Sequence, residues 1–229
     1  GHDQSFTNSY VSNGDDCVSV VPINEFAPEC VNGDAGQEMC RGGNVIVRNV
    51  SCIGGHGISI GGMRHGTVSN ATFSNMTATG GDGDTQGVYS GGGLRVKSYP
   101  NGTGSVYDIL YEDILLDDVY LPVQLLGHYC PWPCNTPDGN QSVAFHDVTF
   151  RRIRGHGRRD VQANFDCSAF APCENIVMDD VVLGSGPKSE ILCAHVDSIK
   201  FGNGSSPSVC SSSSSSTGTS TSDTGISTS

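Results

Sequence analysis

The sequence predicts an all-β chain folded as a right-handed parallel β-helix, which is a solenoid of stacked coils. One short apolar pattern recurs along the chain, and the segments between its copies are rich in turn residues. Glycine contributes 31 of 229 residues and charged residues only 16%, which is typical of turn-rich β proteins. Helical periodicity is weak throughout, so a helical bundle is not expected.

Each copy of the pattern has two apolar positions separated by a variable one, then Asn, Asp or a basic residue before a last apolar residue. Alternation with a period of two indicates a strand with one buried face. Successive copies begin 26, 38, 39 and 28 residues apart, and Gly, Asn and Asp clusters between them indicate turns. The copies lie at residues 45–50, 71–76, 109–114, 148–153 and 176–181, with a weaker one at 5–8.

A single unit of this kind cannot bury its apolar face, and stacking equivalent units solves that problem. A β-sandwich could be built from the same short strands. Its hairpins require tight two-residue turns at short, regular spacing, and such turns are scarce in this sequence. We therefore favour a β-helix over residues 1–204.

The composition changes at about residue 205, where the chain becomes Ser, Thr and Gly with almost nothing apolar to bury. Such a segment cannot pack a core, so residues 205–229 are predicted to be a disordered low-complexity tail. Its Ser and Thr density suits O-linked glycans on an extracellular stalk, and a plain flexible linker is the alternative.

Charge and glycosylation signals narrow the partners and the compartment. Twelve Lys and Arg against 24 Asp and Glu give a formal net charge of −12, which argues against nucleic acid or an anionic membrane as a partner. No apolar run is long enough to span a bilayer, and we expect a monomer. Six Asn-x-Ser/Thr sequons favour secretion to the extracellular space. They begin at Asn49, Asn70, Asn75, Asn101, Asn140 and Asn203.

The even number of ten cysteines favours disulfide bonds formed in an oxidising compartment. A zinc site is the alternative for the closely spaced pairs, but no Cys-x-x-Cys pair or matching His pair accompanies them. The disulfide candidates are Cys17, Cys30, Cys40, Cys52, Cys130, Cys134, Cys167, Cys173, Cys193 and Cys210.

Two adjacent carboxylates, Asp15 and Asp16, form the first candidate site. Neighbouring side chains on a regular strand face opposite ways, so the two converge only where the backbone kinks, which Gly14 permits. Of two carboxyl groups held together, one stays protonated and can donate while the other can activate water. That pair suits hydrolysis of a glycosidic bond, although Gly-Asp-Asp also occurs in ordinary surface turns.

His56 lies between two glycines that leave its imidazole exposed at the mouth of a turn, where it could orient a carboxylate or bind substrate. The same Gly-His-Gly tripeptide recurs at residues 155–157. Five arginines lie within residues 151–159, so we interpret the second copy as a solvated basic loop.

Arg95 and Lys97 share one face of a predicted strand while Val96 turns inward. Two neighbouring cations in an acidic protein form an anion site, because Arg binds a carboxylate through two parallel hydrogen bonds and Lys adds a point charge. A solvated strand face is the alternative. Asp82 and Asp84 could bind calcium, but they lack the downstream Glu of an EF-hand, so we expect a plain loop, with no metal and no cofactor.

Taken in order, Gly-Asp-Asp-Cys at residues 14–17, Gly-His-Gly at 55–57 and Arg-x-Lys at 95–97 resemble glycoside hydrolase family 28, the polygalacturonases and related pectinases. Residues 121–130 resemble the strand that leads to a substrate-binding Tyr of this family, which would be Tyr129. The likeness extends over residues 5–210.

The resemblance implies hydrolysis of α-1,4-linked galacturonan with inversion at the anomeric carbon. Asp15 matches the general acid, Asp16 matches one carboxylate that activates the attacking water, and His56 matches the active-site histidine. Arg95 and Lys97 match the pair that binds the galacturonate carboxylate, so polygalacturonate is the expected partner.

The resemblance also implies a disulfide between Cys17 and Cys52 that holds the catalytic turn. The family carries a further catalytic Asp in an Asn-Thr-Asp motif on the preceding coil, and Asp3 is too near Asp15 in sequence to replace it. We therefore expect an N-terminally truncated, C-terminal portion of a pectinase, with an uncovered apolar end that lowers solubility.

Residues 23–42, an insertion between the Asp pair and His56, resemble the extra loops of exo-acting family members, so exo action is expected. Two other functions stay open. Because one catalytic Asp is absent, the chain could be a non-catalytic pectin-binding module. It could also be a structural β-helix that displays glycans.

Overall fold

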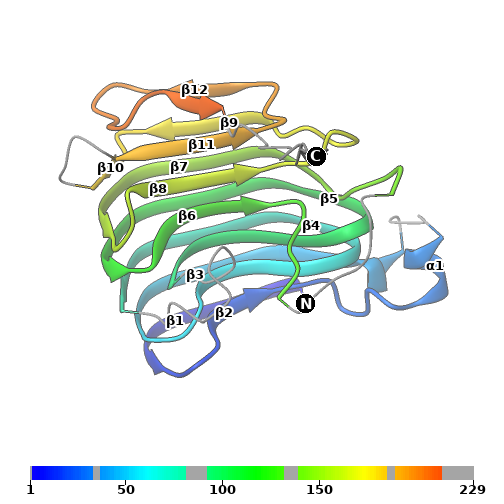
Figure 1. The fold of residues 1–229 in the computed structure, drawn as a ribbon. Helices are drawn as coiled ribbons and strands as arrows, with labels where there is room; N and C mark the ends of the chain where they lie inside the picture. Colours follow the sequence, from blue (N-terminus) through cyan, green and yellow to red (C-terminus); the bar gives the residue numbers. More distant parts are fainter. Residues whose placement is uncertain (1, 33–36, 81–91, 132–138, 185–188, 213–229) are drawn as a thin grey trace, which may run out of the picture.

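The computed structural model describes residues 2–32, 37–80, 92–131, 139–184 and 189–212, and these fold as the predicted right-handed parallel β-helix (Figure 1). All pairings between the named strands of these residues are parallel. The strands are β1 (His2–Ser12), β2 (Asp16–Val20), β3 (Arg41–Ile53), β4 (Gly57–Thr79), β5 (Gly92–Val119), β6 (Leu121–Leu126), β7 (Ala144–Gly157), β8 (Val161–Asp166), β9 (Glu174–Asp179), β10 (Val182–Leu183), β11 (Glu190–Ala194), β12 (Ile199–Phe201) and β13 (Cys210–Ser212).

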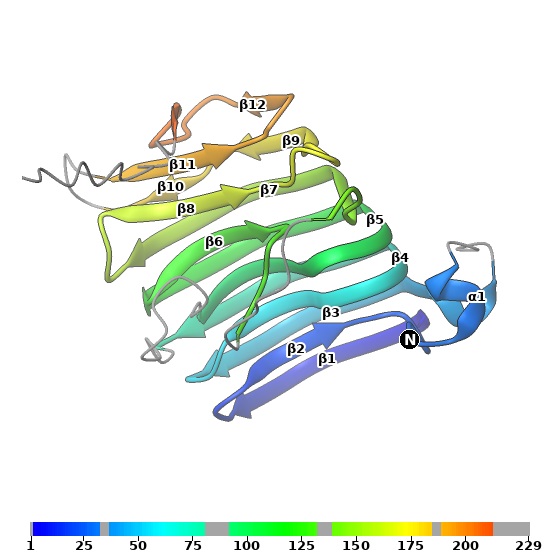
Figure 2. The ribbon, with the colours of Figure 1, turned by 45° about the vertical axis from the view of Figure 1, so that its right-hand side comes forward.

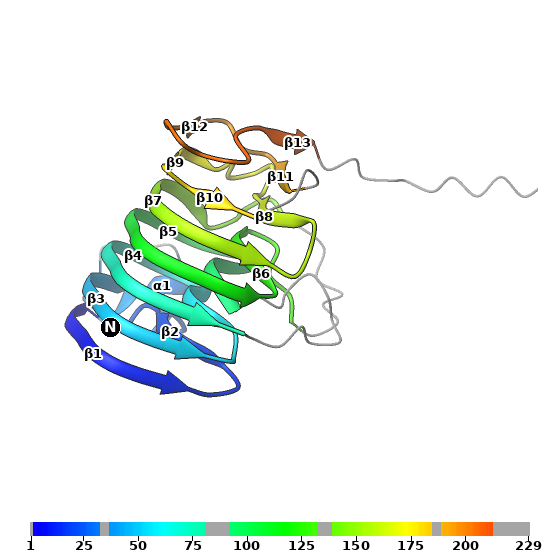
Figure 3. The same cartoon turned by 90° about the vertical axis from the view of Figure 1, so that its left-hand side faces the viewer.

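Two runs of paired strands follow the axis of the solenoid (Figures 2 and 3). The first run contains β2, the beginnings of β4 and β5, and then β6, β8, β11 and β13. The second contains β1, β3, the later parts of β4 and β5, and then β7, β9 and β12. Because β4 and β5 bend from one run into the other, each contributes to both.

The third position of each sequence copy points into the core, as the alternation predicted. These residues lie in register on successive coils and are almost fully buried. They are Val47, Phe73, Tyr111, Phe150 and Met178. The ring centroids of Phe73 and Tyr111 are 4.7 Å apart and those of Tyr111 and Phe150 are 5.4 Å apart, both stacked. This column ties neighbouring coils together through aromatic contact.

The coils turn at two sets of residues, which we call the corner positions, with φ between 49° and 57°. Asn and Asp are tolerated in this left-handed conformation better than other side chains. One set is the fifth residue of each copy: Asn8, Asn49, Asn75, Asp113, Arg152 and Asp180. The other directly precedes the copies, and the sequence pattern did not include it: Asp3, Asn44, Asn70, Asp108, Asp147 and Asn175.

The corner side chains form ladders along the solenoid axis. Asn49 Nδ2 donates to Asn8 Oδ1 at 2.6 Å, and Asn75 Nδ2 donates to Asn49 Oδ1 at 3.3 Å. Further along the same corner, Arg152 Nε donates to Asp113 Oδ1 at 2.7 Å, so an ion pair replaces the amide pair. Three of the predicted sequons begin on these ladders, and their glycosylation stays a prediction.

The β1 end of the solenoid opens into an apolar cavity of about 460 Å³. Phe6, Val18, Val20, Val45 and Val47 are among the residues that line it. Phe6 remains 39% exposed, whereas the equivalent residue of the next coil, Val47, is 1% exposed. The lowered solubility expected for such an end stays a prediction.

The predicted insertion carries the two helices of the described chain, α1 (Pro28–Val31) and the 3₁₀ turn η1 (Glu38–Cys40), joined by a Cys30–Cys40 disulfide. None of the helices in the described residues has the length and apolar character of a membrane span. Further disulfides join Cys17 to Cys52, Cys167 to Cys173 and Cys193 to Cys210, and Cys130 is also disulfide-bonded.

The predicted tail begins in contact with the last coils. Cys210 is bonded to Cys193, and β13 pairs with β11. The domain division at residue 205 stays a prediction, although the pairing continues to Ser212. Residues 213–229, Cys134, and the calcium candidates Asp82 and Asp84 lie outside the described residues.

Candidate active site

The turn before β2 brings the adjacent carboxylates to one side of the solenoid. Asp16 pairs with Gly57 and Val18 with Ile58, so Cys17 is an extra residue in this strand and forms a bulge. The Cys17–Cys52 disulfide fixes the bulge to the neighbouring coil. The φ of Gly14 lies outside the left-handed region and an added Cβ would meet no atom within 4 Å, so this turn does not require glycine at that position.

Asp15 is the exposed member of the pair, with 85% of its side chain accessible. Its Oδ1 accepts a hydrogen bond from the Asp16 backbone N–H at 2.7 Å and lies 3.2 Å from His56 Nδ1. The His56 backbone N–H also donates to the Asp15 carbonyl. The pKa of Asp15 is lowered, first by the Asp16 N–H and then by the imidazole. His56 is therefore placed where it could orient the Asp15 carboxylate, and its role in the site stays a prediction.

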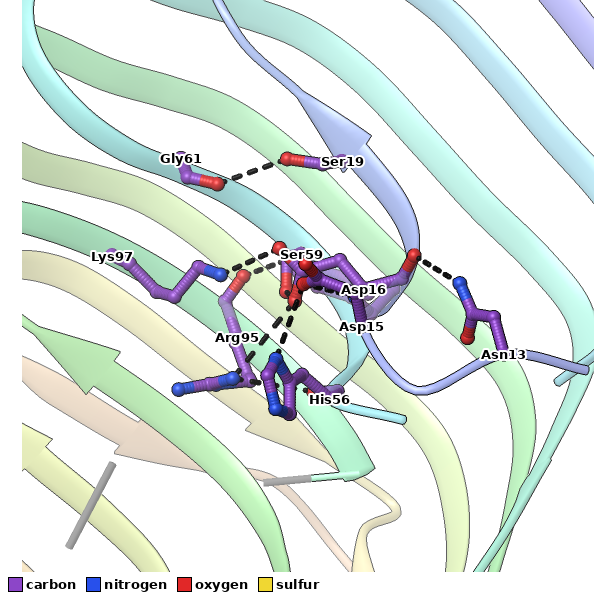
Figure 4. Close-up of polar contacts among 10 residues, drawn as sticks. Asn13, Asp15, Asp16, Ser19, His56, Ser59, Gly61, Arg95 and Lys97 are labelled. Carbon is purple, nitrogen blue, oxygen red and sulfur yellow. Dashed lines mark hydrogen bonds and ion pairs between the residues drawn. The ribbon is translucent and has the colours of Figure 1, made fainter. Parts of the chain in front are cut away.

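Asp16 is the enclosed member, with 13% of its side chain accessible (Figure 4). Lys97 Nζ donates to its Oδ2 at 2.6 Å, and Ser59 Oγ donates to its Oδ1 at 2.7 Å. Arg95 Nη1 lies 3.9 Å from Oδ1. The proton sharing expected from two close carboxyl groups is not what this geometry favours, because Lys97 compensates Asp16 and the pKa of Asp15 is lowered rather than raised.

The cation pair on β5 is more enclosed than the sequence suggested. The side chains of Arg95 and Lys97 are 1% and 4% accessible, and Val96 faces the core as predicted. Burial lowers the pKa of Lys97, with Arg95 as the second cause. Arg95 Nη1 also donates to the His56 carbonyl at 3.4 Å. The alternative of a solvated strand face is wrong, because both side chains are buried. The anion that Lys97 contacts in this structure is the Asp16 carboxylate.

Tyr129 lies beside the two cations. Its ring centroid is 5.1 Å from Lys97 Nζ and 5.6 Å from Arg95 Cζ. The residue is 9% exposed, and burial raises the pKa of its hydroxyl. Its backbone N–H donates to the Ser98 carbonyl, so the ring is held on the face that carries Lys97.

A metal could find ligand atoms here. One atom from each of Asp15, Asp16 and His56 lies within 4.8 Å of the others. The ammonium of Lys97 and the guanidinium of Arg95 lie against the same carboxylate, and their positive charge opposes a cation in that position. The geometry suits the binding of an anion better.

Two hydrogen-bonding residues were missed by the sequence reasoning. Ser59 donates to Asp16, and Asn13 Nδ2 donates to the Asp16 carbonyl at 2.9 Å. Ser59 pairs directly with Arg95 in the sheet, so strand alternation after Gly57 could have placed it on the same face. Asn13 had no periodic signal, because it lies in the turn.

The second Gly-His-Gly tripeptide lies elsewhere. It ends strand β7 and is not a loop, although His156 is exposed as expected. The nearby arginines are paired with carboxylates of neighbouring coils, as in the pairs of Arg154 with Asp180 and Arg158 with Asp118. It therefore takes no part in the candidate site.

The sequence is similar to known proteins over most of its length. The sequence profile described as "Glycosyl hydrolases family 28" matches residues 4–209. The chain belongs to this family. It is 32% identical over 83% of its length to a polygalacturonase of Prunus persica and 30% identical over 82% to one of Persea americana. It spans only 43% and 36% of those relatives.

A solved structure in the same fold is the endo-xylogalacturonan hydrolase from Aspergillus tubingensis. The TM-score is 0.65 at 21% identity, over 91% of this chain and 50% of that one. At this identity the likeness concerns the fold, and it supports the β-helix described above.

Proposed function

We propose that this chain carries most of the active site of an extracellular pectinase that hydrolyses α-1,4-linked galacturonan. The observation that carries the proposal is the convergence of Asp15, Asp16, His56, Arg95 and Lys97, which come from three coils, on one face of the solenoid. Two carboxylates supply acid and base chemistry, and two cations supply affinity for an acidic sugar.

In the proposed reaction, Asp15 donates a proton to the glycosidic oxygen of the leaving sugar. Its exposure suits contact with the substrate, and its lowered pKa must rise in the complex. A uronate bound nearby adds negative charge and excludes water, and both effects raise the pKa of a carboxyl group. His56 positions the Asp15 oxygen. Asp16 accepts a proton from the attacking water.

Lys97 and Arg95 have two roles in this proposal. Lys97 holds Asp16, while Lys97 and Arg95 together place positive charge beside the carboxylate of the bound galacturonate. The ring of Tyr129 contacts the same sugar. No nucleic acid or membrane partner and no cofactor enters the proposal, and we expect the protein to act as a monomer.

Inversion at the anomeric carbon is proposed from the family resemblance. The nearest oxygens of Asp15 and Asp16 lie within 4.8 Å, which is closer than the 6.5–9.5 Å usual between the acid and base of an inverting enzyme. Asp16 therefore needs a second group to place the water. Proton NMR of the first product would distinguish the outcomes, since inversion releases the β-anomer and retention the α-anomer.

Exo action is proposed from the insertion, because α1 and η1 form a disulfide-bonded projection near the first coils. Chromatography of early products tests this point. Exo action releases a single short product from the start, whereas endo action releases a ladder of oligomers.

The test of the function is the Asp15→Asn variant, expressed from the complete coding sequence and assayed for reducing ends released from polygalacturonate. Loss of a general acid is expected to lower the rate by about two to four orders of magnitude. Asp117→Asn is the matched control, because Asp117 is an exposed carboxylate on β5. Equal rates for Asp15→Asn and the control would contradict the assigned acid.

A non-catalytic pectin-binding module is the second candidate. Asp3, the remaining carboxylate near the first coil, is bonded to Asn44 and His2 at the corner and does not join Asp15. Binding of polygalacturonate without turnover, weakened by Arg95→Ala and by salt, would favour this candidate.

A further inference from the structure

We propose that Arg64 and Tyr99 form an additional carboxylate-binding subsite beside the candidate active site. This inference rests on the proposed function, and it extends recognition to a second uronate unit of the same substrate. Neither residue was singled out by the sequence motifs.

A series of two aromatic rings between two cations leads away from Asp16. Lys97 Nζ, which contacts Asp16, is 5.1 Å from the Tyr129 ring centroid. The Tyr129 and Tyr99 centroids are 5.4 Å apart in an edge-to-face contact. The Arg64 guanidinium carbon is 3.9 Å from the Tyr99 centroid. The series therefore connects the enclosed Lys97 of the candidate site to the exposed Arg64.

Gly62 supports both rings from below. A Cβ atom built on Gly62 would lie 2.8 Å from a ring carbon of Tyr99 and 3.0 Å from one of Tyr129, which is closer than real Cβ contacts. The backbone of β4 therefore packs directly against the two tyrosines. Side chains held in this way lose little conformational entropy on binding, which favours a preformed subsite.

The charge of Arg64 is available to a ligand. Arg152 and Arg158, for comparison, form ion pairs with Asp113 and Asp118. No ion pair to the Arg64 guanidinium is found in the described part of the chain, and the residue is exposed. Glu25 is the nearby carboxylate, and it accepts a hydrogen bond at 2.6 Å from the Arg64 backbone N–H. Glu25 thus fixes the insertion to β4.

A planar guanidinium stacked on an aromatic ring keeps its N–H groups at the edge, where they can bind a carboxylate through two hydrogen bonds. Tyr99 is half-buried and Arg64 lies over its ring, so the ring holds the guanidinium in place. A polymer that carries a carboxylate on each unit offers that guanidinium a partner next to the candidate site. The chemistry therefore selects an acidic sugar over a neutral one.

The test measures binding of digalacturonate and hexagalacturonate by calorimetry at low salt, with protein expressed from the complete coding sequence. Every protein compared carries Asp15→Asn, so that the ligand is not hydrolysed during the titration. Arg64→Ala is expected to weaken the binding of hexagalacturonate about ten-fold and the binding of digalacturonate much less. Tyr99→Ala should act in the same direction, whereas Tyr99→Phe, which keeps the ring, should bind as the unaltered protein does. Arg48→Ala is the matched control, since Arg48 is an exposed arginine on β3, in the other run of strands.

Three results are distinguishable. A larger loss for hexagalacturonate than for digalacturonate in Arg64→Ala, absent in Arg48→Ala, supports the subsite. Binding of both ligands with no change in Arg64→Ala overturns the subsite and leaves the proposed function standing. Failure of the unaltered protein to bind either ligand overturns the proposed function and the subsite together. Thermal unfolding of each variant shows whether the substitution disturbed the fold.

Discussion

The corner ladders and the candidate site use polar side chains in opposite ways. At the corners, each coil presents nearly the same residue to the next, as Asn8, Asn49 and Asn75 do. At the site, each coil presents a different residue: Asp16 from β2, Ser59 from β4 and Lys97 from β5. The corners are exposed, whereas Lys97 is only 4% accessible.

This difference separates the two sources of order in a solenoid. A repeated corner contributes a small and similar stabilisation at each coil, and its residues recur in the sequence. A buried ion pair occurs once, and its desolvation cost must be met by good geometry and additional hydrogen bonds. Substitutions in the two regions should therefore differ in size, in additivity and in their response to pH and salt.

The largest effect on stability is expected from Lys97→Met. Removal of the ammonium leaves the enclosed Asp16 carboxylate with Ser59 as its close donor, which should cost about 2–3 kcal/mol of unfolding free energy. Urea denaturation measures this cost. The double variant Asp16→Asn with Lys97→Met should recover most of it, because the two contacting charges are removed together while Arg95 keeps its hydrogen bond to the His56 carbonyl. A double variant less stable than Lys97→Met would contradict the account.

Asn49→Ala tests the ladder and should have a smaller effect. The variant loses the bonds to Asn8 and Asn75 and places alanine at a φ of 57°. Together these changes should cost about 1–2 kcal/mol by urea denaturation.

Asn49→Gly separates the two causes, because glycine accepts this φ without strain and loses only the hydrogen bonds. The stability of Asn49→Gly should therefore lie between that of the unaltered protein and that of Asn49→Ala. Asn140→Ala is the control, at an exposed Asn without positive φ. Equal stability of Asn49→Ala and Asn140→Ala would show that the ladder contributes nothing.

The same contrast explains what the sequence could predict. Core residues such as Phe73 and Tyr111 occupy one position of the repeat, so alternation alone placed them inside. The corner residues that precede each copy were missed, because the pattern was anchored on apolar residues. The sequence does contain a signal for this corner, since Asn44 and Asn70 each lie directly before a copy of the pattern.

The sequence predicted which residues form the site, but it did not predict which of them contact one another. Motif resemblance named Asp15, Asp16, His56, Arg95 and Lys97, and the coils bring them together. The contact between Asp16 and Lys97 joins residues 81 positions apart. Only the register of stacked coils determines such a contact, so reasoning from adjacent carboxylates gave the wrong expectation about their protons.

The smallest effect concerns two exposed ion pairs between neighbouring coils, one at the corner residue Asp113 and one at Asp118. Hydrogen bonds from Arg152 and Arg158 are the main cause that lowers the pKa of Asp113 and of Asp118 below the usual value near 4. A carboxyl group whose pKa is lower in the folded state than in the unfolded state stabilises the fold when the pH is above its unfolded pKa. That contribution is lost as the pH falls through the folded pKa.

The difference in melting temperature between the unaltered protein and Arg152→Gln should therefore be present at pH 7 and disappear as the pH falls through the lowered folded pKa of Asp113. High salt at pH 7 should reduce it as well, because exposed pairs are screened. Arg48→Gln is the control without a corner carboxylate. A pH-independent difference for Arg152→Gln would mean that packing at the corner, and not charge, is what the arginine provides.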